Sequence, residues 1–246
     1  MLTNKRHEYI LNVIKEKGSV TVLELQNALN ISESTVRRDL TELDKNGRLC
    51  KVFGGAVAID SSFSSRELSV SQKQAVNLDD KIKIAKYAAS LIRPDDFIYI
   101  DAGTTTGCII DFLTEKKATY VTNAVSHARL LAQAGFHVII IGGELKGTTE
   151  AIVGSQALIS LSGYHFTKGF FGTNGISRQA GFTTPDDNEA AVKRTAMEHC
   201  RHNYILADTE KFGKVSPITF AAFDDASILT TDAPDGYRLC SNLKIV

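Results

Sequence analysis

The chain has 246 residues, 43% of them apolar and 23% charged, which is enough apolar surface for one large folded domain or two smaller ones. Its 28 basic and 28 acidic residues cancel, which excludes a uniformly basic nucleic-acid coat but permits a local basic face. No apolar run approaches the roughly 18 residues of a membrane span, and MLTNKRHEYI lacks the apolar core of a signal peptide. We therefore expect a cytoplasmic protein.

The cysteines and histidines show no metal-binding pattern. Cys50, Cys108, Cys200 and Cys240 are scattered without a Cys-x-x-Cys pair, so neither a zinc knuckle nor a disulfide framework is indicated. The six histidines show no ligand spacing. We predict reduced thiols, no metal and no cofactor.

The first 57 residues predict three short helices followed by a small β-ribbon. Apolar residues recur at helical spacing in residues 5–17, which Gly18 closes, and again in two shorter segments. Ser32 is a good N-cap for the third helix, and Gly47 ends it. The stripes are Ile10, Val13 and Ile14, then Val22, Leu25 and Leu29, and finally Val36, Leu40 and Leu43. This order predicts a winged helix-turn-helix domain over residues 1–57.

One face of the third helix has the composition of a groove-reading surface. Hydroxyl groups near the helix start and arginines that fork onto guanine or phosphate are typical of such helices, and basic residues in the wing suit backbone contacts. A face of merely solvated charges is the alternative. The candidate DNA-binding residues are Ser34, Thr35, Arg37, Arg38, Thr41 and Lys45, with Arg48 and Lys51 in the wing.

The run Ser32-Glu-Ser-Thr-Val-Arg-Arg-Asp-Leu40, with Gly54-Gly-Ala further on, closely resembles the DeoR family of bacterial transcriptional regulators. The resemblance implies sequence-specific binding to a double-stranded DNA operator. It extends over nearly the whole chain and is weakest in residues 58–75, a Ser-rich stretch with Arg66 and Lys73 that we predict to be a linker.

Residues 76–246 alternate helices with Val/Ile-rich strands, which predicts a mostly parallel α/β domain with both sheet faces covered. Ligands bind such sheets at the carboxyl ends of the strands, and five predicted strands end in small, hydroxyl, amide or charged residues. The Gly/Thr loop after residue 100 could hold a phosphate at a helix N-terminus. The candidate effector-binding residues are Asp101, Gly103, Thr104, Thr105, Thr106, Thr122, Asn123, Gly142, Gly143, Asn174, Gly175, Asp186, Glu189, Lys193, Asp208 and Lys211.

Each of these features also has a plain structural interpretation. Gly142-Gly143 could form only a turn, Glu189 and Lys193 could form a surface ion pair, and Asp208 could cap the next turn. Their joint position at strand ends favours a site for a phosphorylated ligand.

The second domain resembles the DeoR-type effector domain, which is similar in fold to ribose 5-phosphate isomerase. Where those isomerases carry an acidic stretch, this chain has Gly172-Thr-Asn-Gly175, and an amide cannot act as a general base. We therefore predict a binding pocket and no enzyme.

Residues 167–193 resemble the subgroup that represses fructose operons, which implies fructose 1-phosphate as inducer. The resemblance leaves three alternatives: a different sugar phosphate, an activator, or a sugar-phosphate isomerase. A homodimer or homotetramer is expected, because helix-turn-helix proteins read paired half-sites.

Overall fold

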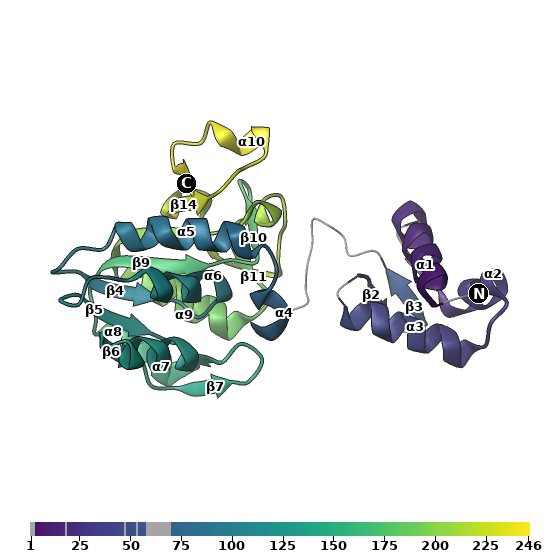
Figure 1. The fold of residues 1–246 in the computed structure, drawn as a ribbon, viewed down its shortest axis with the longest axis horizontal. Coiled ribbons are helices and arrows are strands. Elements are labelled where there is room, and N and C mark those ends of the chain that lie inside the picture. Colours follow the sequence, from purple (N-terminus) through teal and green to yellow (C-terminus); the bar gives the residue numbers. More distant parts are fainter. Residues whose placement is uncertain (1–2, 18, 47, 53, 58–69) are drawn as a thin grey trace. The chain divides into compact units, whose positions relative to one another are not determined.

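The computed structural model describes residues 3–17, 19–46, 48–52, 54–57 and 70–246. Its contacts divide the chain into two compact units, Met1–Ser64 and Ser65–Val246 (Figure 1). The predicted helix ends at Gly18 and Gly47, and residues 58–69 of the predicted linker with Arg66, lie outside the described residues.

The first unit is a winged helix-turn-helix, as predicted. Ser32 caps the third helix, because its hydroxyl accepts a hydrogen bond from the Thr35 amide; Thr21 and Glu24 form a capping box on the second. The three-stranded antiparallel sheet has the order β1-β3-β2; β2 and β3 form the predicted ribbon, and β1 was not predicted. The elements are α1 (Thr3–Lys17), β1 (Ser19–Thr21), α2 (Val22–Leu29), α3 (Glu33–Lys45), β2 (Cys50–Val52) and β3 (Gly55–Val57).

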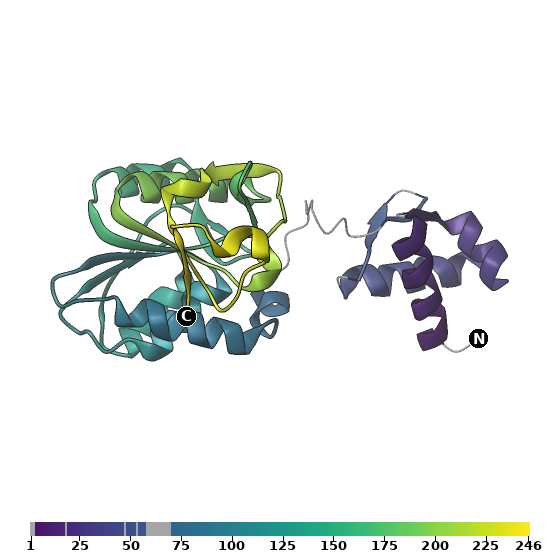
Figure 2. The same ribbon diagram turned by 90° about the horizontal axis from the view of Figure 1, so that it is seen from above.

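The second unit is built on a seven-stranded parallel sheet with the order β15-β14-β12-β9-β4-β5-β6. Figure 2 shows helices on both faces of this fanned sheet. Its strands are β4 (Phe97–Ile100), β5 (Thr119–Thr122), β6 (His137–Ile140), β9 (Phe166–Gly172), β12 (Cys200–Leu206), β14 (Ser227–Thr230) and β15 (Leu243–Ile245). The predicted α/β class is therefore confirmed.

Alternate strand residues fill two separate cores, because successive side chains of a strand point to opposite faces. Ile98 and Ile100 pack in one core and Tyr99 in the other. The first core includes apolar residues of α5, η1 and α7, and the second those of α8 and α9. The helices are α5 (Leu78–Ser90), α6 (Thr104–Gly107), the 3-10 helix η1 (Cys108–Phe112), α7 (Val125–Gln133), α8 (Ser155–Ser162) and α9 (Asp187–Glu198).

The smaller elements of this unit were largely missed by the sequence analysis. The sequence predicts a helix over Cys108–Thr114, but the structure has the 3-10 helix η1 there, preceded by α6. Residues 70–74 of the predicted linker are helical. Three-residue strands are too short to show a periodic pattern. These elements are α4 (Val70–Gln74), β7 (Glu144–Lys146), β8 (Ala151–Val153), β10 (Gly175–Ser177), β11 (Gly181–Thr184), η2 (Thr209–Lys211), β13 (Ile218–Ala221), η3 (Phe223–Asp225) and α10 (Asp235–Arg238).

The described residues bear on thiols, metal ligands and membrane spans. Within them, Cys108, Cys200 and Cys240 are free thiols, and no cluster of metal-ligating side chains occurs. In the same part of the chain, no helix is both long and apolar enough to cross a membrane.

Candidate DNA-binding face and effector site

The predicted face of α3 is exposed to solvent, whereas its opposite stripe is buried. Val36 and Leu40 are fully buried in the core of the unit. Arg37 forms an ion pair of 2.6 Å with Glu33, one turn earlier. Arg38 is exposed and forms no ion pair within the described residues, so its guanidinium is available to a base or phosphate. The exposed predicted residues are Ser34, Arg37, Arg38, Thr41, Lys45, Arg48 and Lys51, and Thr35 is half-buried.

Lys51 connects the wing to the recognition helix. Its ammonium donates to the Thr41 hydroxyl at 2.7 Å, and its backbone N–H donates to Asp44 at 3.1 Å. The wing therefore has a fixed position beside the outer face of α3, where a phosphate backbone would pass.

Asp39, within the Ser32–Leu40 motif, has a structural role. Its carboxylate is 1% exposed and accepts hydrogen bonds from Arg6 Nε at 2.7 Å and Arg6 Nη2 at 3.0 Å. Burial raises the pKa of Asp39, but the hydrogen bonds and charge of Arg6 outweigh it and hold that pKa below its ordinary value. This pair joins α1 to α3 and so orients the recognition helix.

In the second unit, the Gly/Thr loop after β4 closes on itself. The Thr106 hydroxyl donates to the Asp101 carbonyl at 2.6 Å and to the Gly103 carbonyl at 3.0 Å. Thr106 is fully buried, whereas Thr105 retains 9% exposure and Gly103 and Thr104 are half-buried. The loop backbone and the two preceding hydroxyls are therefore better placed for a ligand than Thr106 is.

His127 on α7 packs against this loop. A Cβ on Gly107 would lie 2.7 Å from His127 Nε2, so only glycine allows this close approach. Burial lowers the pKa of His127 to about 4, although a hydrogen bond with the Gly103 backbone raises it. The ring is therefore neutral at physiological pH, and sequence analysis missed it because a lone histidine on a helix shows no pattern.

Two predicted residues, Asp101 and Lys193, meet the Gly172 backbone in a buried ion cluster at the carboxyl ends of β4 and β9. Lys193 on α9 is ion-paired with Asp101 and donates to the Gly172 carbonyl at 3.2 Å. The Gly172 amide donates to the same Asp101 carboxylate at 3.0 Å. Burial raises the pKa of Asp101, and Lys193 offsets only part of that effect.

Glu189, one turn before Lys193, extends the cluster to the β7–β8 hairpin. Its carboxylate accepts from the Thr149 hydroxyl at 2.5 Å and from Lys146 at 3.2 Å, and Lys146 also pairs with Asp186 at 2.9 Å. Burial raises the pKa of Glu189, but Lys193, Thr149 and Lys146 outweigh it, so the carboxylate stays ionised. Glu189 and Lys193 are thus buried groups and not a surface ion pair.

A second group of charges lies beside the Gly/Thr loop and includes a residue that we did not predict. Lys81 on α5 is only 4% exposed, and burial lowers its pKa, while nearby Asp208 raises it and nearby Lys211 lowers it. Asp208 also caps η2, accepting from the Glu210 amide at 3.1 Å. Lys81 and Lys211 therefore bring two positive charges to one place near the loop.

Several other predicted residues are engaged in the fold itself. Thr122 accepts from the Ala124 amide at 3.1 Å, and Asn123 accepts from the Ala102 amide at 2.8 Å. A Cβ on Gly143 or Gly175 would lie within 2.6 Å of a backbone carbonyl oxygen. Asn174 accepts from Thr184 at 3.3 Å. These residues shape the loops, and Gly142 is exposed.

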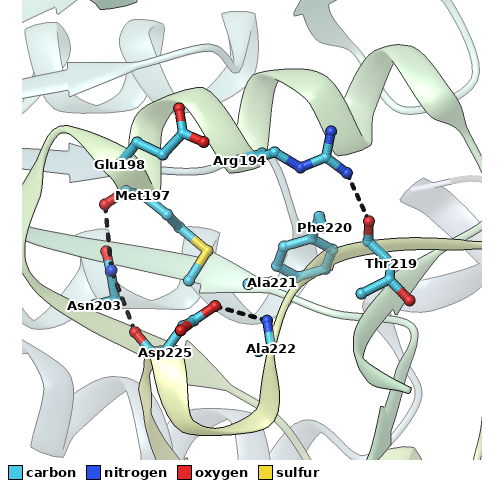
Figure 3. A pocket seen from close by; sticks show the side chains of 9 residues that line it. All are labelled: Arg194, Met197, Glu198, Asn203, Thr219, Phe220, Ala221, Ala222 and Asp225. Carbon is cyan, nitrogen blue, oxygen red and sulfur yellow. Dashed lines mark hydrogen bonds between the residues drawn. The ribbon is translucent and has the colours of Figure 1, made fainter. Parts of the chain in front are cut away.

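A separate pocket of about 560 Å³ lies between α9, β13 and η3, and Figure 3 shows the residues that line it. Arg194 donates across it to the Thr219 carbonyl at 2.7 Å. None of the predicted effector residues lines this pocket, so it is distinct from the strand-end cluster.

Comparison with known proteins defines the class of this chain. Residues 6–62 match the DeoR-like helix-turn-helix domain, and residues 76–233 match the DeoR C terminal sensor domain. The chain therefore belongs to the DeoR family of transcriptional regulators, as the Ser32–Leu40 motif predicted.

Full-length relatives agree with this assignment. The chain is 43% identical over 251 residues to the uncharacterized HTH-type transcriptional regulator FruR of Bacillus subtilis, covering 100% of this chain and 99% of the relative. It is 33% identical over 238 residues to the lactose phosphotransferase system repressor of Staphylococcus aureus, covering 96% and 94%.

Among solved structures, ribose 5-phosphate isomerase A of Methanocaldococcus jannaschii is 16% identical with a TM-score of 0.41, covering 55% of each chain. The sorbitol operon regulator SorC of Klebsiella pneumoniae is 12% identical with a TM-score of 0.39, covering 83% of this chain and 89% of that one. These likenesses are too distant to indicate an activity.

Proposed function

We propose that this protein represses a sugar-utilisation operon, with fructose as the favoured sugar. A phosphorylated sugar such as fructose 1-phosphate would release it from its operator. The observation that carries the proposal is the presence in one chain of an exposed recognition helix and of a buried ion cluster at the strand ends of a sensor sheet. The resemblance of residues 167–193 to the subgroup that represses fructose operons favours fructose.

DNA recognition is assigned to the outer face of α3. Arg38 is free to fork onto a guanine edge or a phosphate, and Ser34 lies exposed near the helix start. Lys51, held by Thr41 at 2.7 Å, would contact the phosphate backbone from the wing.

Effector recognition is assigned to the strand-end residues of the second unit. The phosphate would bind the loop backbone at residues 103–105, next to the positive charges of Lys81 and Lys211, because backbone N–H groups and cations both favour a dianion. Glu189 and Asp186 offer carboxylate oxygens that accept hydrogen bonds from sugar hydroxyls. Their fixed pairing with Lys146 would orient them.

Isomerase activity is the second candidate function, and the chemistry of residues 172–175 argues against it. Asn174 stands where the resembling isomerases carry an acidic stretch, and its amide cannot take up a proton at neutral pH. Asp101 is ion-paired with Lys193 and buried, so it is held in place and shielded from solvent. We therefore propose a binding pocket without turnover.

The test is fluorescence anisotropy of the DNA upstream of this gene's operon, titrated with protein with and without fructose 1-phosphate. Binding that weakens with this sugar phosphate, but not with fructose 6-phosphate or ribose 5-phosphate, supports the proposal. Binding that ignores fructose 1-phosphate contradicts the effector, and absence of specific binding contradicts the repressor. Turnover of ribose 5-phosphate well above background would contradict the non-enzymatic assignment.

A further inference from the structure

The free edge of strand β6 carries features that a soluble protein does not leave uncovered. β6 pairs with β5 and with no other strand of the described chain. The amide of Ile141 bonds back to Thr122 on β5 at 3.1 Å, so, by strand alternation, Val138 and Ile140 direct their backbone N–H and C=O groups away from β5. These groups form a ready template for another strand.

The composition of β6 does not protect this edge. Exposed edge strands usually carry Lys, Pro or a bulge that prevents pairing, but β6 is His-Val-Ile-Ile and regular in its register with β5. The opposite edge of the same sheet, β15, has Lys244 at its centre. The contrast indicates that β6 is kept ready for a partner strand.

Exposed apolar side chains occur on β6 and on the elements beside it. α7 packs against β6, α8 lies next to Gly142 just after β6, and the β7–β8 hairpin follows β6 directly in the chain (Figure 1). Five large side chains on these elements are 40–64% exposed: Val125, Leu130, Ile140, Leu145 and Ile159. A concentration of exposed apolar residues on β6 and the elements beside it favours an interaction surface.

We propose that this surface, the β6 edge with these five side chains, pairs two copies of the chain through antiparallel β6 strands related by a two-fold axis. For its choice of partner, the inference rests on the proposed repressor, because two half-sites require two recognition helices. A two-fold contact brings each surface against itself, and β6, free of Lys, Arg, Asp and Glu, does not repel its copy.

The charges at the two ends of β6 also fit an antiparallel pair. Lys116 lies at the amino end, where its ammonium bonds to the Ala134 carbonyl and stacks on the Phe136 ring. Exposed Glu144 follows the carboxyl end. Antiparallel pairing brings Lys116 of each copy towards Glu144 of the other, whereas parallel pairing would align like charges. Pairing of a four-residue edge alone buries less than the about 800 Å² per partner of a stable interface. The apolar side chains would supply the remaining contact area.

The test is sedimentation velocity of the full chain, with Ile140→Lys as the disrupting variant and Ile245→Lys as its matched control. Both residues are on edge strands and are 44% and 46% exposed. We expect Ile140→Lys to raise the dissociation constant at least tenfold, giving a smaller assembly, while Ile245→Lys leaves association unchanged. Thermal melts of each variant check folding, and Leu145→Lys replaces Ile140→Lys if that variant does not fold.

Three results would overturn the inference: a monomeric parent protein, unchanged association in both Ile140→Lys and Leu145→Lys, or equal dissociation of Ile245→Lys. Operator binding by the same proteins separates this inference from the proposed function. Operator binding without pairing through β6 contradicts only the pairing surface. Pairing through β6 without any operator binding contradicts only the proposed function.

Discussion

At the scale of single residues, the exposed arginines of α3 differ in how far the fold already uses them. Arg37 is held by Glu33 at 2.6 Å, whereas Arg38 is exposed and forms no ion pair within the described residues. A side chain without an internal partner breaks no ion pair when it turns to DNA, so Arg38 is the better candidate for reading a base.

Arg38→Ala is therefore predicted to cost about 1–3 kcal/mol of operator binding, or roughly 5- to 150-fold in affinity. Fluorescence anisotropy at fixed salt measures the change. The control is Arg129→Ala, which removes an exposed arginine from the sensor unit and should leave operator affinity unchanged. An unchanged affinity for Arg38→Ala would remove this residue from the interface.

Neighbouring threonines of the Gly/Thr loop are predicted to behave differently. Thr105→Val keeps the shape of the side chain and removes a hydroxyl near the loop surface, so a tenfold or larger excess of effector should be needed to release DNA, while operator affinity stays the same. In Thr106→Val, loss of the 2.6 Å bond to Asp101 should instead lower the thermal midpoint. If Thr105→Val abolishes DNA binding, the loop is structural and does not hold the ligand.

Lys81 shows what the sequence could and could not reveal at this scale. It belongs to the apolar stripe of α5 at helical spacing with Ile84, Ala85 and Ala88, all three fully buried. A lysine within an apolar stripe indicates a buried charge, so Lys81 could have been predicted from the sequence. The hydrogen bonds that Asn123 and Thr122 accept from backbone amides could not be predicted, because any residue type supplies a backbone amide.

At the scale of elements, α7 holds the Gly/Thr loop through one uncharged ring. His127 is buried, with a pKa of about 4, while the pKa of an unfolded histidine is about 6.5. Because the folded pKa is lowered, its contribution to stability is present above pH 6.5 and is lost as pH falls towards 4. Linkage puts the loss at about 2 kcal/mol by pH 5 and about 3 kcal/mol by pH 4.

The thermal midpoint of the full chain should therefore fall between pH 7 and pH 5, and His127→Gln should flatten that dependence. His202→Gln is the control, because His202 is exposed and its removal should not change the slope. Differential scanning calorimetry at pH 7, 6 and 5 measures all three proteins. A slope that is equal in the parent and in His127→Gln would show that another group governs the acid sensitivity.

The elements were predictable where their own residues carry a local signal. The sequence pattern predicts strands over Phe97–Ile100, Thr119–Thr122 and Ser227–Thr230, and these are the bounds of β4, β5 and β14. Their branched and aromatic residues lie between turn signals, which makes them recognisable. The β10-β11-β13 sheet was missed, because β10 and β11 each begin with glycine and contain no apolar run, so that tertiary contacts hold them in place. The Arg6–Asp39 pair, 33 residues apart in the chain, likewise depends on packing and not on local pattern.

At the scale of the whole molecule, the proposed function requires the operator and the sugar-phosphate effector to influence each other's binding through one chain. An effector can weaken operator binding only if it prefers the conformation or assembly that binds DNA poorly. The β7–β8 hairpin touches both the proposed effector site and the proposed pairing surface. Its Lys146 pairs with Glu189 at 3.2 Å, and the neighbouring Leu145 is exposed in the pairing surface. Movement of the hairpin on effector binding would therefore reach that surface.

Thermodynamic linkage makes this coupling measurable from both directions. If fructose 1-phosphate raises the Kd for operator by a given factor, saturating operator must raise the Kd for fructose 1-phosphate by the same factor. For a coupling of about 1–3 kcal/mol, the factor is roughly 5 to 150. Isothermal titration of the full chain with fructose 1-phosphate, without operator and with a twofold excess of operator, gives the change in the Kd for the sugar phosphate. Anisotropy gives the change in the Kd for operator.

A scrambled duplex of equal length is the control, and it should leave the Kd for fructose 1-phosphate unchanged at the same salt concentration, because nonspecific duplex binding is weak at physiological salt. Equal factors would mean that one effector site and one DNA surface account for the regulation. A larger effect on DNA than on the sugar phosphate would require a further effector site, and the pocket lined by Arg194 and Phe220 is where we would look for it. No effect in either direction would contradict the sugar phosphate as effector while leaving the recognition helix unaffected.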